Sequence, residues 1–226
     1  MSHTSIRVVV ESTPKRVFVS ALDWPGWARG GKTEEAAVGA LLAAAPRYAR
    51  VAAAAGYLLD GAGPELILDV VERVDGDAST AFGVPAIVAD ADREPVDAVD
   101  AARLAAIVDA AWRAFDRVAA AAPEELRKGP RGGGRDRTKM VEHVTGGDDA
   151  YAAVLGLGAA ERRTMTGLRE QVLAILRQPS DGSPIAGKRW PPRYAARRIA
   201  WHALDHAWEI EDRTEPGEDR TEPGFR

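Results

Sequence analysis

Apolar residues recur every three or four positions along most of the second half of the chain, the spacing of helices with one apolar face. Segments that contain proline or glycine separate four such stretches. Four helices of about 15–20 residues fit an all-α, up-and-down four-helix bundle, in which consecutive helices are antiparallel neighbours. The predicted helices are Val99–Ala121, about Thr138–Leu155, about Ala159–Arg177, and a fourth that has Pro191 and Pro192 in its first turn and continues to about Asp212.

The first ninety or so residues have a mixed α/β pattern. The runs Ser5–Glu11 and Lys15–Leu22 are rich in β-branched residues and are separated by a short turn, which predicts a β-hairpin. Thr33 precedes two glutamates and suits a helix N-cap, so a helix is expected from there to about Ala55. A further strand is predicted at Glu65–Val74, returning to the same sheet.

Glycine, proline and aspartate residues punctuate the segment between Asp75 and Asp97, which is the expected domain linker, although Val84–Val88 could form a short strand. The predicted fold class is therefore α+β: a small α/β domain over residues 1–90, then the all-α bundle over residues 91–213. Residues 214–226 are expected to be a disordered tail, because the chain end repeats the polar sequence EDRTEPG.

Composition excludes several kinds of function. The chain has 226 residues and no cysteine, so disulfides, thiolate metal sites and a cysteine nucleophile are absent. A formal net charge of −4 gives no basic field, which makes nucleic acid an unexpected partner. No segment reaches the roughly 18–20 apolar residues of a membrane span, and no signal peptide is visible. We expect no membrane association and a cytoplasmic location.

Three of the four histidines lie on apolar faces of predicted helices. His202 and His206 are one turn apart on the fourth helix, and His143 lies in the inward-facing stripe of the second. A buried imidazole without a partner costs about 1–3 kcal/mol. A shared metal ion would satisfy all three rings at once. From spacing alone, metal binding and a hydrogen-bonded structural cluster both remain open.

Three nitrogen ligands without thiolates leave a coordination position open, as in catalytic rather than structural metal sites. Zinc is the expected ion, with nickel, iron or manganese as alternatives, because imidazole suits several divalent metals. A water at the open position would be acidified, or a thiolate would replace it. Asp205, Glu142 and Glu209 are candidates to orient the rings, although each also fits a solvated helix position.

Two segments carry a resemblance to a known superfamily. The run Arg137–Val144 (RTKMVEHV), followed by Tyr151, resembles the second-helix signature of DinB-like proteins, and Arg198–Glu209 (RIAWHALDHAWE) resembles their fourth-helix HxxxH segment. The resemblance covers about Val99–Arg213. It implies a divalent metal held by His143, His202 and His206. Some members of the superfamily are transferases or isomerases that use mycothiol or bacillithiol, which makes such a thiol a possible cosubstrate here.

The N-terminal half resembles a second family. Val17–Trp27 (VFVSALDWPGW) and Gly31–Ala36 (GKTEEA) are similar to HicB-like antitoxin domains, in which a strand ends in a Pro-Gly turn before a helix start. This chain departs from them at Trp27, and it lacks a recognisable DNA-binding segment. The resemblance implies a small docking or dimerisation module that contacts a protein partner or a second copy. The alternative is that this half only covers part of the bundle.

Two weaker features leave further interpretations open. The run Gly26–Thr33 (GWARGGKT) formally matches a phosphate-binding loop, but the expected hairpin lacks the larger α/β sheet that such a loop needs. Trp201 and Trp208 form a second apolar face on the fourth helix, which could pack in the core, against the N-terminal half or against a partner subunit.

These features lead to two hypotheses. The first is a metal-dependent DinB-like enzyme that transfers groups to or from a low-molecular-weight thiol, or isomerises a thiol adduct. The second is a non-catalytic, antitoxin-like interaction protein in which the metal is structural. The sequence indicates neither a substrate nor catalytic residues beyond the metal ligands.

Overall fold

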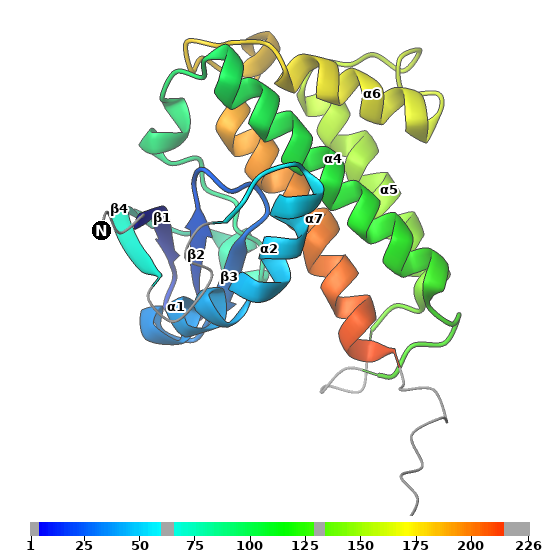
Figure 1. The fold of residues 1–226 in the computed structure, drawn as a ribbon, viewed down its shortest axis with the longest axis horizontal. Helices are drawn as coiled ribbons and strands as arrows, with labels where there is room; N and C mark the ends of the chain where they lie inside the picture. The colour runs from blue at the N-terminus through cyan, green and yellow to red at the C-terminus, as the bar shows by residue number, and fades with distance from the viewer. Residues whose placement is uncertain (1–4, 60–65, 129–133, 215–226) are drawn as a thin grey trace, which may run out of the picture.

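The protein has a mixed α/β architecture, seen in a computed structural model that describes residues 5–59, 66–128 and 134–214 (Figure 1). His3 and most of the C-terminal repeat lie outside the described residues. Over those residues the elements are β1 (Ser5–Ser12), β2 (Val17–Ala21), β3 (Ala28–Gly31), α1 (Glu34–Ala43), α2 (Ala45–Ala54), β4 (Ile67–Asp75), α3 (Ala78–Phe82), η1 (Asp90–Arg93), α4 (Ala98–Ala121), α5 (Arg137–Val154), α6 (Met165–Leu176), η2 (Ile185–Gly187) and α7 (Pro192–Arg213).

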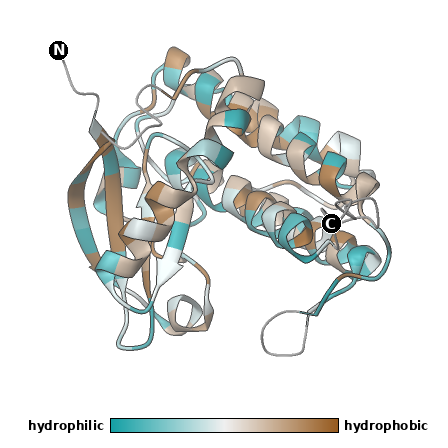
Figure 2. Ribbon diagram, turned by 60° about the horizontal axis from the view of Figure 1, so that its bottom comes forward, coloured by the Kyte–Doolittle hydropathy of each residue, from teal (hydrophilic) through white to brown (hydrophobic). Residues whose placement is uncertain are grey.

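The strands form one sheet in the order β3-β2-β1-β4. β1 and β2 pair antiparallel, which confirms the predicted hairpin, and β3 continues the antiparallel pairing with β2. β4 pairs parallel with β1, because the chain crosses over through α1 and α2 before returning. The sheet shows long brown, apolar stretches in Figure 2, in agreement with the burial of Val8, Val10 and Val19.

The helix predicted from Thr33 to Ala55 is in fact two helices. Thr33 caps α1 as expected, accepting a hydrogen bond from the amide of Ala36 at 3.2 Å. The chain then breaks at Ala44, and Pro46 lies in the first turn of α2. Proline lacks an amide hydrogen and its ring clashes with the carbonyl four residues earlier, so the first helix cannot continue through it. After the break, Tyr48 is buried and stacks on Trp27 with ring centres 5.2 Å apart.

The short strand that the sequence allowed at residues 84–88 of the linker is not formed, so this prediction was wrong. The buried carboxylate of Glu11 accepts hydrogen bonds from the amides of Ala86 at 3.1 Å and Ile87 at 3.2 Å. These amides are therefore satisfied by a side chain and are not available to a strand partner.

The four long helices pack in a different order from the predicted up-and-down one. α7 packs against both α4 and α5, and α6 also packs against both. α4 and α7 run in the same direction: Arg193 near the start of α7 donates to Asp100 near the start of α4 at 2.7 Å, and past the far ends the amide of Arg127 donates to the carbonyl of Arg213 at 2.8 Å. The connection from residue 177 to residue 191 is long enough to bring the chain back beside the start of α4.

The N-terminal half packs along α7, which lies between the sheet and α5 (Figure 1). A side chain at Gly26 would come within 2.8 Å of Leu204, so the Pro-Gly turn contacts this helix directly. Trp201 meets Phe18 edge-on at 6.2 Å, and Arg29 lies 4.0 Å over the ring of Trp208. The second apolar face of α7 therefore packs against the N-terminal half, one of the three interpretations that the sequence left open.

One hydrophobic core includes residues from both halves of the chain. The domain boundaries at residues 90 and 213 therefore stay a prediction. The segment that resembled a phosphate-binding loop is strand β3 followed by the N-cap of α1, and a side chain at Gly31 would come within 2.5 Å of the amide of Ala37. Gly31 is therefore packed closely against the first turn of α1. None of the described helices combines the length and apolarity needed to cross a membrane.

Candidate metal centre

The three histidines predicted as metal ligands come together between α5 and α7. The ring centre of His143 lies 5.0 Å from that of His202 and 4.8 Å from that of His206, and the two rings of α7 are 4.9 Å apart. One ring nitrogen from each residue falls within 4.8 Å of the others. The rings meet edge to face and are not stacked.

The closest approach between these rings has the dimensions of a metal site. Nε2 of His202 lies 3.2 Å from Nε2 of His143. Two nitrogen ligands on a tetrahedral zinc ion, each about 2.0–2.1 Å from it, would be about 3.3 Å apart. The ligand nitrogens of all three residues lie within 4.8 Å of one another, so the ring of His206 has to move closer to the other two to complete a tetrahedral set. The donors present therefore fit a divalent metal ion.

Glu209 orients one of the three rings. Its carboxylate lies 3.1 Å from Nδ1 of His206 and also accepts a hydrogen bond from Arg213 at 2.9 Å. The hydrogen bond with His206 is the largest effect that lowers the pKa of Glu209. A carboxylate beside Nδ1 favours the tautomer that carries its proton on Nδ1. The lone pair of Nε2 of His206 is then left to bind a metal.

The other two candidate carboxylates do not orient the rings. Asp205 pairs with Arg29 at 3.3 Å. Glu142 is exposed and lines a pocket on a different side of α5. Sequence alone could not separate the three, because the distinction depends on which arginines lie nearby.

Replacing Glu209 with glutamine should lower metal affinity by about 10–100-fold, the usual cost of removing such a partner of a ligating histidine. Glu142→Gln removes the same charge from the neighbouring helix and should leave affinity within about twofold. Competition against a chromogenic chelator measures both. Equal affinities in the two variants would contradict the role given to Glu209.

Burial favours the neutral, metal-binding form of His202 and His143. His202 is 5% exposed, and burial, followed by the charge of His206, lowers its pKa to about 2. Burial also lowers the pKa of His143. Neutral imidazole is the form that binds metal, so these rings need not lose a proton first at neutral pH.

The metal-free protein should lose stability in acid because of His202. The unfolded chain protonates this residue near pH 6.5 while the folded state excludes the proton, so stability falls as the pH drops below that value. Between pH 6.5 and pH 5 the loss is about 2 kcal/mol. Urea unfolding at several pH values should show a smaller loss for His202→Gln than for the wild type. Parallel pH profiles for the two proteins would contradict this assignment.

Two residues that the sequence did not single out complete the surroundings of His202. Gly147 on α5 lies directly against its ring, and a side chain there would come within 2.4 Å of Cε1. Arg198 on α7 stacks against Tyr151, whose ring is 5.5 Å from that of His202. For Gly147 the sequence did contain a signal, the adjacent pair Gly146-Gly147 inside a helix. Glycine destabilises the middle of a helix, so its presence there indicates a packing reason.

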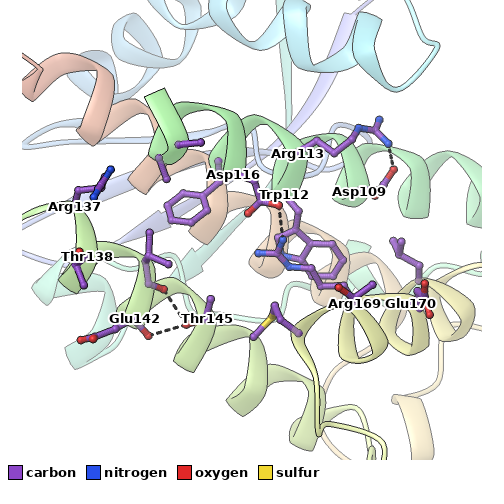
Figure 3. Close-up of a pocket in the computed structure, with 17 residues that line it drawn as sticks. Asp109, Trp112, Arg113, Asp116, Arg137, Thr138, Glu142, Thr145, Arg169 and Glu170 are labelled. Atoms are coloured by element: carbon purple, nitrogen blue, oxygen red, sulfur yellow. Dashed lines mark hydrogen bonds and ion pairs between the residues drawn. The ribbon is translucent and has the colours of Figure 1, made fainter. Parts of the chain in front are cut away.

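A pocket between three of the long helices is separate from the triad. It measures about 770 Å³ and lies between α4, α5 and α6, with Trp112 and Phe115 among its lining residues (Figure 3). Arg169 at its wall is held by Asp116 at 2.8 Å and by the buried Asp148 at 3.0 Å. Its other arginines are also ion-paired. This pocket therefore presents no unpaired cation to an anionic ligand.

Comparison of the chain with models of known protein families, with curated proteins and with solved structures gave no match. The DinB-like and HicB-like resemblances therefore rest on the quoted residues of this chain and stay predictions.

Proposed function

We propose that this chain is a metal-dependent protein of DinB-like type. In this proposal α4, α5, α6 and α7 form a DinB-like four-helix bundle, and the first ninety residues form a HicB-like domain docked on it. The observation that carries the proposal is the triad itself: three imidazoles from two helices, with ring nitrogens within 4.8 Å of one another.

The donor set supports a catalytic rather than a purely structural ion. Three histidines leave at least one coordination position for water or substrate. Zinc fits these ligands best, and nickel, iron or manganese are the alternatives. When bound, such an ion would lower the pKa of a thiol or water at the open position. A low-molecular-weight thiol such as mycothiol or bacillithiol is the proposed cosubstrate, and transfer to it or isomerisation of its adduct is the proposed reaction class.

Metal analysis of protein purified without a histidine tag tests the proposal. We expect close to one equivalent of a divalent transition metal in the wild type, after reconstitution if necessary. His202→Ala should retain less than about a tenth of this amount, because its ligand nitrogen is lost. A wild type with less than about a tenth of an equivalent under all conditions would refute it.

A second candidate is a non-catalytic interaction protein in which the metal stabilises the helices. The observation that favours it is β4, which stands at the edge of the sheet with Ile67 47% and Val71 39% exposed. A free strand edge with apolar side chains can add a strand from a partner or a second copy. This candidate predicts a stable complex in pulldown that tolerates His202→Ala, a loss of thermal stability in that variant, and no turnover with any thiol adduct.

A further inference from the structure

Arg198 lies on α7 one turn before His202 and two turns before His206. This spacing of four places the three side chains along one side of the helix. The guanidinium carbon of Arg198 is 5.1 Å from the ring centre of Tyr151 and 4.8 Å from that of Trp201. Tyr151 in turn lies 5.5 Å from the ring of His202. The cation is therefore fixed beside the triad by two aromatic rings.

Arg198, which is partly buried, differs from the buried arginines of its helix in its ion pairing. Arg193, Arg197 and Arg213 each pair with a carboxylate within 3.0 Å. Within the described parts of the chain Arg198 has no carboxylate partner, and its NH1 atom is buried without a hydrogen-bond acceptor. A buried donor left unsatisfied costs about 1–3 kcal/mol. One donor nitrogen of this side chain is thus held in place without a hydrogen-bond acceptor among the described residues.

The charges around the triad favour an anion. The guanidinium of Arg198 lies one turn from His202, against the rings of Tyr151 and Trp201. The nearby carboxylates are already engaged, Asp205 by Arg29 and Glu209 by His206 and Arg213. A bound divalent ion would add further positive charge to the site.

We propose that the ligand of this site carries an anionic group, a carboxylate, sulfonate or phosphate, close to the atom that binds the metal, and that Arg198 binds this group. The proposal rests on the metal site proposed above and narrows its substrate to anionic thiols. A guanidinium suits the task, because its fork of N–H donors matches the oxygens of such groups. Arg198 then determines specificity, while the three histidines hold the ion.

Two small thiols with the same two-carbon skeleton provide the test. Mercaptoethanesulfonate carries an anion and mercaptoethanol carries a neutral hydroxyl. Both would be titrated into the full chain loaded with cobalt, whose visible spectrum reports a sulfur ligand without any need for turnover. The variants are Arg198→Met and Arg198→Lys, and the control Arg177→Met removes the same charge from an exposed position beyond α6.

In the wild type we expect mercaptoethanesulfonate to bind at least about tenfold more tightly than mercaptoethanol, the effect of one charge-assisted hydrogen bond. Arg198→Met should lose this preference, while its affinity for mercaptoethanol stays unchanged. Arg198→Lys should keep part of the preference, and Arg177→Met should keep all of it.

Cobalt binding without any preference in the wild type, or a preference that survives in Arg198→Met, would overturn the role of Arg198 and leave the metal site standing. Failure to bind cobalt would instead refute the metal site. The wild-type comparison decides the matter even if Arg198→Met does not fold.

Discussion

Replacing Asp92 with alanine should lower the free energy of unfolding by about 3–5 kcal/mol, a large part of the stability of an ordinary domain. Asp92 is fully buried and accepts two hydrogen bonds from Arg197, at 2.8 Å and 2.6 Å, which join η1 to α7. The substitution leaves a guanidinium that is only 8% exposed without a counter-ion. Urea unfolding should show a lower midpoint with an unchanged slope.

Two further variants separate this effect from a general sensitivity to charge. Arg73→Ala breaks the exposed pair with Glu34 and should leave the free energy of unfolding nearly unchanged, because solvent screens such pairs. Combining Asp92→Ala with Arg197→Met removes both buried charges and should recover part of the loss. An Asp92→Ala variant as stable as Arg73→Ala would show that the pair does not hold η1 to α7.

Gly147→Ala should weaken metal binding by at least about a hundredfold, because it acts on a ligand rather than on a ligand's partner. The added carbon would come within 2.4 Å of Cε1 and 2.9 Å of Nδ1 of His202. His143, His206 and Tyr151 surround the same ring, so it has little room to move aside without leaving the other two ligands. Overpacking of this kind costs about 1–3 kcal/mol. Chelator competition and urea unfolding measure the two effects.

The neighbouring glycine provides a matched control. A side chain at Gly146 would meet nothing within 4 Å. Gly146→Ala should therefore leave metal affinity unchanged and raise stability by about 0.5–1 kcal/mol, the ordinary gain for alanine over glycine in a helix. If Gly147→Ala binds metal as well as Gly146→Ala does, the ring of His202 is not packed as the structure shows.

The local features of this molecule followed from the sequence. The β-branched runs predicted the hairpin of β1 and β2, and the apolar spacing predicted helices close to α4, α5 and α7. The same spacing predicted that His143, His202 and His206 would converge, because angular position on a helix depends only on residues a few positions apart.

Tertiary structure decided what depends on residues far apart in the chain. α7 runs parallel to α4 because the long connection before α7 brings the chain back beside the start of α4. The apolar spacing of a helix does not tell which way the helix runs beside another. In the sequence, Glu209 was one of three equivalent candidates to orient the histidine rings. In the structure, Asp205 pairs with Arg29, and Glu209 lies against His206. Arg198 has an unused donor because the carboxylates around it pair with other arginines. Sequence periodicity determines which face a side chain occupies, whereas its partner depends on how the helices and the sheet pack together.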